Sequence, residues 1–273
     1  MKKILSKFLL YIILIAISLI VFIPLYWMLI SSLKENIDVF SIPIIWWPKK
    51  LIWNNYAEVF KVMPFITNIL NSFKLVVIIT IVQLFTSSFA AYGFSKIEFP
   101  GRDLLFVGYI FTLAIPWQSY MIPQFMIMRT FKLIDKHLAL VLLLSFTALG
   151  VFLIKQFYAS IPYELNEAAR IDGLSEYGIY AKIILPLSKP AIAALTISTF
   201  VNVWNDYMGA IIYLNSDNKK TIQLALRELI TSYGPEYSLI MAGSVISLIP
   251  VLILFLFLQR YFVAGISMSG LKG

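Results

Sequence analysis

Residues 8–30 read FLLYIILIAISLIVFIPLYWMLI, a run without a single charged side chain. A membrane-spanning helix needs about 20 predominantly apolar residues. Five further stretches of similar length and composition follow this one, at roughly 70–93, 104–127, 138–159, 188–211 and 238–260. The sequence therefore predicts an all-α integral membrane protein whose six transmembrane helices form a single transmembrane domain over residues 1–273.

The composition supports a membrane protein and excludes several classes of function. Apolar residues make up 60% of the chain and charged residues 13%, whereas soluble domains carry about 25% charged residues. The chain has no cysteine and a single histidine, His137, so no thiolate or two-histidine metal site is available. We expect no metal and no cofactor on this chain. The net charge of +8 comes from lysines and arginines scattered beside the spans, which does not indicate a nucleic-acid partner.

The charges around the first span determine the predicted orientation. Lysines and arginines are equally numerous on the two sides of the six spans, but Lys2, Lys3 and Lys7 precede the first span, whereas Lys34 and Glu35 follow it. Positive charges beside the first span usually lie in the cytoplasm, so both termini are expected there. The outer segments would then be 31–69, 128–137 and 212–237, and the cytoplasmic ones 95–103, 160–187 and 260–273.

The longest cytoplasmic segment between spans, residues 160–187, has the pattern of two short helices. Pro162 suits the first turn of a helix. Gly173 can supply the left-handed residue that ends this helix, and Ser175 can cap a second helix that ends near Pro186. These features alone leave two interpretations open, a docking element for another protein or an amphipathic loop at the bilayer surface.

The spacing within this segment resembles a known signature. Seven positions match the EAA signature of ABC importer permeases: Glu167, Ala168, Ala169, Gly173, Ile183, Leu185 and Pro186. Along almost its whole length the chain resembles the maltose-type, carbohydrate-importing branch of that family. Three further runs support the resemblance: Phe99-Pro100-Gly101-Arg102, Trp204-Asn205-Asp206 and Leu271-Lys272-Gly273.

The resemblance implies a type I ABC importer permease fold and a mechanism. In that family the EAA segment forms coupling helices that sit in a cleft of a cytoplasmic ATPase subunit, and ATP-driven closure rocks the permease pair between inward-facing and outward-facing states. By this resemblance Glu167 would pair with a basic group of the ATPase, Ala168 and Ala169 would allow close contact, and Gly173 would form the bend. Asp172 and the remaining signature residues would complete the ATPase-coupling set.

The resemblance also implies the partners and the location of the chain. The partners would be a second permease subunit in a heterodimer, two ATPase subunits that carry ATP and Mg²⁺, and an extracytoplasmic sugar-binding protein. The chain would cross the lipid bilayer of a bacterial or archaeal cytoplasmic membrane several times and would not be an enzyme. The sequence also indicates that this chain does not bind ATP itself. Gly173 and Gly178 have the spacing of the two glycines of a P-loop, but the Lys-Ser/Thr pair that a P-loop needs to bind phosphate does not follow them.

The fifth expected span contains Asp206, the one carboxylate within any expected span. A charge at the bilayer centre costs about 2.5–3.5 kcal/mol on insertion scales, so Asp206 should face a polar cavity or the outer interface. Trp204, Asn205 and Tyr207 lie beside it, and aromatic faces next to amide and carboxylate groups suit a hydroxyl-rich ligand. These four residues are candidates for the substrate pathway. The open alternative is an interfacial aromatic belt with a solvated aspartate.

The outer segment 212–237 contains a polar, turn-rich run at residues 215–220. In the maltose-type family the equivalent loop reaches into the binding protein, which makes Asn215, Asp217, Lys219 and Lys220 candidate contact residues. The alternative is a solvated connection between two spans, although 26 residues are more than a connection needs.

Taken together, the residues and the resemblance predict the membrane-spanning permease subunit of a binding-protein-dependent ABC importer for a carbohydrate. The alternative is a secondary, ion-coupled transporter with a polar site around Asp206. Such transporters usually show internal repeats or broken helices around an ion site. Asp206 is the one carboxylate within the expected spans, and a single carboxylate gives little support for ion coupling. The sequence supports a membrane enzyme even less, because no paired carboxylates or metal ligands lie within the expected spans.

Overall fold

The structure is a computed structural model that describes residues 2–231 and 236–269. Throughout these residues the regular secondary structure is helical, which confirms the predicted all-α fold class. The chain divides into two compact units, Met1–Ile66 with Ala225–Ile249, and Thr67–Leu224 with Pro250–Gly273. The single transmembrane domain over residues 1–273 stays a prediction.

The first unit contains the N-terminal helix and the segment that follows it. Its elements are α1 (Lys2–Ser31), the 3₁₀ turn η1 (Asn36–Asp38), α2 (Asn54–Val62), most of α13 (Ile222–Thr231) and the first part of α14 (Tyr237–Ser269). The apolar side chains of α1 are exposed from Phe8 to Leu25, as expected for a helix that lipid or a partner subunit covers. Asn55 ties α2 to the end of α1 by donating hydrogen bonds to the carbonyls of Ser32 and Lys34, at 2.9 Å each.

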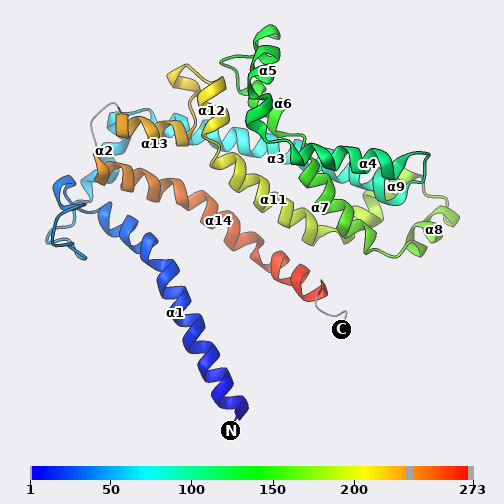
Figure 1. The fold of residues 1–273 in the computed structure, drawn as a ribbon, viewed down its shortest axis with the longest axis horizontal. Coiled ribbons are helices and arrows are strands. Elements are labelled where there is room, and N and C mark those ends of the chain that lie inside the picture. The colour runs from blue at the N-terminus through cyan, green and yellow to red at the C-terminus, as the bar shows by residue number, and fades with distance from the viewer. Residues whose placement is uncertain (1, 232–235, 270–273) are drawn as a thin grey trace. The chain divides into compact units, whose positions relative to one another are not determined.

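The second unit holds the remaining helices and the candidate functional residues. Its elements begin with α3 (Phe65–Lys96), α4 (Arg102–Phe111), η2 (Thr112–Ala114), α5 (Trp117–Thr130), α6 (His137–Leu144) and α7 (Ala148–Ala159). They continue with α8 (Glu164–Ile171), α9 (Glu176–Ile179), the π-helix η3 (Tyr180–Ile184), α10 (Leu185–Leu187), α11 (Lys189–Trp204), α12 (Met208–Tyr213) and η4 (Asp217–Lys219). Helices α7 and α11 lie side by side (Figure 1).

Two apolar clusters form the core of this unit. One joins the end of α3 at Lys96 to α7, α9 and η3, and includes Tyr92, Ile154 and Ile179. The other joins the opposite half of α3 to α6 and α12, and includes Ile79 and Tyr213. The segment between α7 and α11 is therefore packed against the transmembrane helices and does not extend freely from them.

Six apolar segments overlap the six expected spans, but three of them are bent, and the fifth runs over Glu176–Trp204 where 188–211 was expected. Among the described residues, the segments Ser6–Ser31, Phe65–Lys96 and Tyr237–Gln259 are helices long and apolar enough to cross a membrane. The other three are helix pairs bent by 98° between α4–η2 and α5, by 41° between α6 and α7, and by 77° between Glu176–Leu187 and α11. Counting each bent pair as one span gives the predicted six.

Proline accounts for the sharpest of these bends. Ile115 and Pro116 have extended backbone angles, with ψ of 112° and 134°, between η2 and α5. A proline disfavours helical geometry in the residue before it, so the helix ends there and a new one begins at Trp117. Pro123, in contrast, remains inside α5. The expected span 104–127 is therefore two helices.

Glycine allows α7 to approach α3 closely. A Cβ atom at Gly150 would lie 2.5 Å from Ser87 Oγ and 2.8 Å from Thr147 Cγ2, whereas a Cβ atom at Gly93 would meet nothing within 4 Å. Small residues at a helix contact are typical of membrane proteins, where association depends on close van der Waals packing. The α3–α7 contact therefore depends on the absence of a side chain at position 150.

We predict that Gly150→Ala destabilises the protein by about 1–3 kcal/mol, because the added methyl group overpacks the α3–α7 contact. Gly93→Ala is the matched control, since alanine there has free space and gains up to about 1 kcal/mol of helix propensity. The unfolding midpoint of the purified protein in detergent measures both. Equal stabilisation by the two substitutions would show that the contact has room for a side chain.

Candidate functional site

The segment 160–187 is called the coupling segment below. Its two short helices have the boundaries that the sequence predicts. Helix α8 is followed by Gly173 with a φ of 81°, the left-handed conformation that ends the helix. Ser175 Oγ accepts a hydrogen bond from the Gly178 amide at 3.3 Å and caps α9. The second helix continues through η3 and α10 and ends at Leu187, next to Pro186 as expected, before the bend at Ser188.

The EAA residues divide between the surface and the core. Glu167 and Ala168 are exposed on α8, and Asp172 and Gly173 are exposed in the turn after it. Ala169 is 4% exposed and packs in the cluster around Tyr92. Ala169 is therefore not available for the expected contact with an ATPase, whereas the contact expected of Ala168 stays a prediction.

The last three signature residues lie at the other end of the coupling segment. Ile183 and Leu185 are partly buried against the same cluster, and Pro186 is exposed. These two apolar side chains therefore face the core of the chain itself.

An ion pair that sequence spacing did not indicate holds the coupling segment together. Arg170 Nε donates to Glu176 Oε1 at 2.7 Å, and Arg170 Nη1 donates to the Tyr163 hydroxyl at 2.8 Å. These hydrogen bonds, that to Glu176 foremost, raise the pKa of Arg170 above its ordinary value, so the guanidinium stays charged. The two partners are six residues apart across a turn, a spacing that no helical pairing rule predicts.

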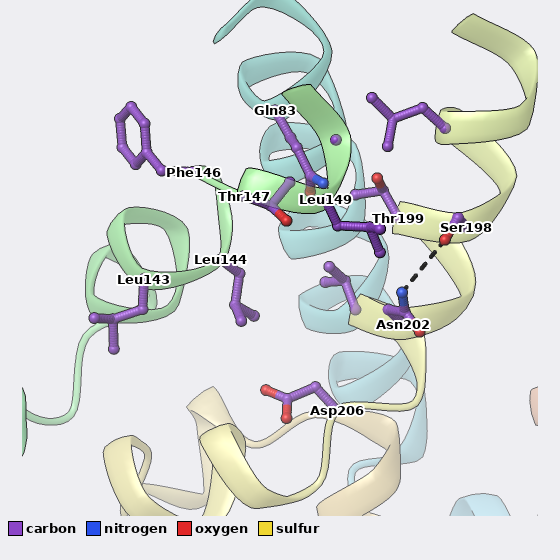
Figure 2. Close-up of a pocket in the computed structure, with 13 residues that line it drawn as sticks. Gln83, Leu143, Leu144, Phe146, Thr147, Leu149, Ser198, Thr199, Asn202 and Asp206 are labelled. Atoms are coloured by element: carbon purple, nitrogen blue, oxygen red, sulfur yellow. Dashed lines mark hydrogen bonds between the residues drawn. The ribbon is translucent and has the colours of Figure 1, made fainter. Parts of the chain in front are cut away.

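A cavity of about 270 Å³ lies between α3, the α6–α7 break and α11. Its polar lining residues are Gln83, Thr147, Ser198, Thr199, Asn202 and Asp206. Figure 2 shows Ser198 and Asn202 on successive turns of α11, joined by a 3.5 Å hydrogen bond, with Asp206 below them. Thr199 Oγ1 and Asp206 Oδ2 are buried and find no hydrogen-bond partner among the described residues. The cavity is thus lined by polar residues inside an apolar helix bundle, and two of these residues hold an enclosed oxygen without such a partner.

Asp206 also has a structural role at the end of α11. Its Oδ1 accepts a hydrogen bond from the Gly209 amide at 3.0 Å and so caps α12. A Cβ atom at Gly209 would collide with the carboxylate, so this arrangement needs glycine at position 209. Asp206 lines a second cavity of about 230 Å³ as well, together with Trp117 and Gln124. One oxygen of this carboxylate therefore holds the break between α11 and α12 while the other is left without a partner.

The other three predicted pathway residues lie away from the 270 Å³ cavity. Trp204 is 1% exposed and stacks on Phe200, with ring centroids 5.8 Å apart. Asn205 Oδ1 accepts a hydrogen bond from Gln223 at 3.2 Å, and Tyr207 packs against the cluster around Ile79. The wall of this cavity therefore carries amide, hydroxyl and carboxylate groups and not the predicted aromatic residues, and a pathway role for Trp204, Asn205 and Tyr207 stays a prediction.

The sequence carried a signal for this polar wall. Ser198, Asn202 and Asp206 are spaced four residues apart, which places them on one face of a helix in an otherwise apolar span. Gln83 and Thr199 come from a separate helix and an adjacent position, so only the folded structure brings them to the same cavity.

The polar run 215–220 is held by one aspartate. Asp135 Oδ1 accepts hydrogen bonds from the backbone amides of Asn215 and Ser216, at 3.0 Å each. Its Oδ2 accepts from Ser216 Oγ at 2.6 Å and from Lys219 Nζ at 2.8 Å. These bonds, Lys219 first, hold the pKa of Asp135 well below its usual range. Sequence analysis assigned Asp135 no role.

A second set of bonds anchors the same run to α3. Asn71 Nδ2 donates to the carbonyls of Asn218 and Lys220 at 2.9 and 3.1 Å. Lys220 itself pairs with Asp217 at 2.5 Å. Asn215, Asp217 and Asn218 remain exposed, while Lys219 and Lys220 are engaged within the loop. The expected contact loop is therefore a fixed surface, at least in this part. Residues 232–235 of the same segment and Leu271-Lys272-Gly273 lie outside the described residues.

We predict that Asp135→Ala increases the mobility of residues 215–216. Asp135→Asn should have a smaller effect, because asparagine keeps a hydrogen-bond acceptor and tolerates the φ of 59° at this position. Hydrogen-exchange protection of the Asn215 and Ser216 amides should fall in the order wild type, Asn, Ala. The folded-state pKa of Asp135 is depressed, so wild-type protection should hold from about pH 8 to pH 5 and be lost only below the unfolded value near 4. Full protection in Asp135→Ala would contradict the assignment.

Comparisons with known proteins agree with this architecture. The sequence profile described as "Binding-protein-dependent transport system inner membrane component" matches residues 83–268. The arabinooligosaccharides transport system permease AraQ of Halalkalibacterium halodurans is 34% identical over 279 residues, covering 100% of both chains. The polygalacturonan/rhamnogalacturonan transport system permease YtcP of Bacillus subtilis is also 34% identical, over 288 residues and 100% of both chains.

Two further comparisons extend the range of relatives and support the fold. The sn-glycerol-3-phosphate transport system permease UgpE of Yersinia enterocolitica is 31% identical over 256 residues, covering 91% of each chain. A chain from the crystal structure of a bacterial ABC transporter involved in importing the acidic polysaccharide alginate has a TM-score of 0.82 and 25% identity, and the match covers 94% of this chain and 96% of that one. The chain therefore belongs to the family of inner membrane components of binding-protein-dependent transport systems, and it is a transport permease.

Proposed function

We propose that this chain is the permease subunit of a carbohydrate importer that a separate ATPase drives through the coupling segment. The observation that carries this proposal is the placement of Glu167 and Ala168 on an exposed face of α8 that is fixed from behind by the Arg170–Glu176 ion pair. Relatives named for arabinooligosaccharides and for polygalacturonan support a carbohydrate as the transported solute.

The exposed face of α8 has the chemistry of a docking surface. Glu167 supplies a negative charge, Ala168 allows a partner backbone to approach, and Ile171 adds an apolar side chain that is 86% exposed. A partner that covers this face would bury the apolar side chain and place the charge at the polar rim of the contact. The partner on this face would be the ATPase subunit that binds ATP and Mg²⁺, and the face would then lie in the cytoplasm together with both termini.

The polar cavity beside α11 would form part of the solute pathway. Its hydroxyl, amide and carboxylate groups can exchange hydrogen bonds with the hydroxyls of a sugar as it passes. A second permease subunit would complete the pathway. The fixed loop surface at residues 215–218 would contact the extracytoplasmic sugar-binding protein on the opposite side of the membrane.

An ion-coupled mechanism finds less support in the same cavity. Asp206 is the one ionisable residue among the residues that line it, and one of its oxygens already caps α12. Proton and sodium pathways usually employ chains of ionisable groups. The cavity is therefore better suited to hydrogen bonding with a solute than to carrying the coupling ion.

We predict that Glu167→Lys uncouples the transporter. Reversing a charge at a desolvated interface costs about 2–5 kcal/mol, so ATP hydrolysis stimulated by the binding protein should fall more than tenfold in the purified complex. Glu98→Lys is the matched control, since Glu98 is an exposed carboxylate outside the coupling segment. Size-exclusion chromatography checks that both variants assemble. Normal stimulation in Glu167→Lys would overturn the role proposed for α8.

We also predict that the cavity is reached by water, as a solute pathway must be. The chain has no cysteine, so a single Ser198→Cys substitution can be probed with a charged, membrane-impermeant thiol reagent. Ser198→Cys should react, and its reaction rate should change when the ATPase is trapped with vanadate. Ile81→Cys on the exposed apolar face of α3 should stay unreactive in both conditions. Failure of Ser198→Cys to react in either condition would exclude the cavity from the pathway.

A further inference from the structure

Three polar side chains on one face of α3 are bonded to the coupling segment. They are spaced four residues apart, which aligns them along the helix: Ser88, Tyr92 and Lys96. The name "polar ladder" is used below for these three residues. They are 2%, 3% and 4% exposed, so all of them lie in the protein interior.

Each rung of the polar ladder reaches a different part of the coupling segment. Lys96 Nζ donates to the carbonyl of Ile161 at 2.6 Å, at the start of the segment. The Tyr92 hydroxyl donates to Glu176 Oε2 at 2.6 Å, in its middle. The Ser88 and Tyr180 hydroxyls share a hydrogen bond of 2.8 Å, in the π-helix η3. The attachment to α3 therefore extends over most of the coupling segment.

Glu176 connects helix α8 to the polar ladder. Its Oε1 accepts from Arg170 of α8 at 2.7 Å, while its Oε2 accepts from Tyr92 of α3. Arg170 also donates to Tyr163, so the guanidinium spans α8 from its first residues to its last turn. Two short charge-assisted hydrogen bonds, Arg170 to Glu176 and Tyr92 to Glu176, would thus transmit a displacement of α8 to α3. Such bonds are stronger and more directional than neutral ones.

The connection of the coupling segment to α11 has a different character. The chain passes through the π-helix η3 and then bends by 77° before α11 begins at Lys189. A π-helical stretch inside a helix often marks a hinge or a functional site. The following helix is therefore joined to the coupling segment by an irregular junction, whereas α3, which lies far away in sequence, is joined by buried hydrogen bonds.

We propose that Tyr92, Arg170 and Glu176 are positioning residues that transmit the movement of the ATPase to α3, so that α3 and the coupling segment move as one body. The bend between α10 and α11 acts as the joint that absorbs the change. This inference rests on the proposed ATPase drive of the coupling segment. It adds the path by which that drive enters the membrane helices.

The absence of cysteine from the chain permits a direct test with pairs of spin labels. The complete complex with its partner permease and ATPase subunits is labelled with a neutral nitroxide reagent, either at Glu164→Cys and Ile81→Cys, on α8 and α3, or at Glu164→Cys and Asn205→Cys, on α8 and at the end of α11. All three positions are exposed. Label distances are measured without nucleotide and after trapping with ATP and vanadate. The 164–81 distance should stay constant, and the 164–205 distance, which spans the bend between α10 and α11, should change.

The ladder itself is tested by removing one hydroxyl. Tyr92→Phe should broaden the 164–81 distance distribution in the trapped state. It should also lower the ratio of binding-protein-stimulated to basal ATP hydrolysis by about tenfold, the factor expected from losing one hydrogen bond to a charged acceptor. Tyr177→Phe is the matched control, because Tyr177 is 72% exposed on α9 and its ring contact with Phe89 is kept. Exchanging the charges, Arg170→Glu with Glu176→Arg, should restore part of the ratio lost in either single variant.

Each contrary outcome identifies what has failed. A wild-type 164–81 distance that changes on trapping, or a Tyr92→Phe variant equal to wild type in both distance and ratio, would overturn the transmission path while leaving the ATPase drive intact. A complex in which neither distance responds to ATP and vanadate would overturn the proposed drive, and the inference with it. An equal fall of stimulated and basal hydrolysis in Tyr92→Phe, with the 164–81 distance still narrow, would show a role in assembly and contradict the proposal.

Discussion

The constraint on which this structure depends is the absence of water in the hydrocarbon core of a membrane. A polar group there must find a partner within the protein or face a cavity, because an unsatisfied group costs several kcal/mol. The chain meets this constraint with polar pairs that join distant segments. Tyr92 bonds to Glu176 across 84 residues, and Lys96 bonds to Ile161 across 65. The same bonds that satisfy α3 also attach the coupling segment to it.

The groups left unsatisfied by these pairs indicate where something else must enter. Thr199 Oγ1 and Asp206 Oδ2 have no partner among the described residues, and both residues line the cavity beside α11. Water or a hydroxylated solute can supply the missing hydrogen bonds, whereas a lipid chain cannot. At the ends of the helices, where water is available, Asp135 instead gathers four donors and fixes a loop. Other buried groups without a partner in the described part of the chain, such as Thr80 Oγ1 and the Asn166 amide, lie outside this cavity, so the cavity together with its unpaired groups marks the candidate pathway.

The sequence predicted the parts that depend on local rules and missed those that depend on tertiary placement. Six apolar runs predicted six spans, and Gly173 and Ser175 predicted the helix boundaries of the coupling segment, because length, φ and capping are local properties. The sequence grouped Trp204 with Asn205 and Asp206 because the three residues are consecutive. In the structure Trp204 is buried and stacks on Phe200, a contact that residue order alone does not predict. The Arg170–Glu176 pair and the role of Asp135 required the fold.

The EAA signature itself illustrates this difference. Its residues Glu167 and Ala168 lie at the surface, whereas Ala169 and Ile183 pack against the core around Tyr92. A helix held on one side by apolar contacts and an ion pair presents its other side in a fixed orientation, which reduces the entropy lost when a partner binds. The buried half of the signature would therefore contribute to the proposed docking without touching the partner. A pattern of residue types at fixed spacing describes both halves equally, and only the fold shows which residues are available for contact.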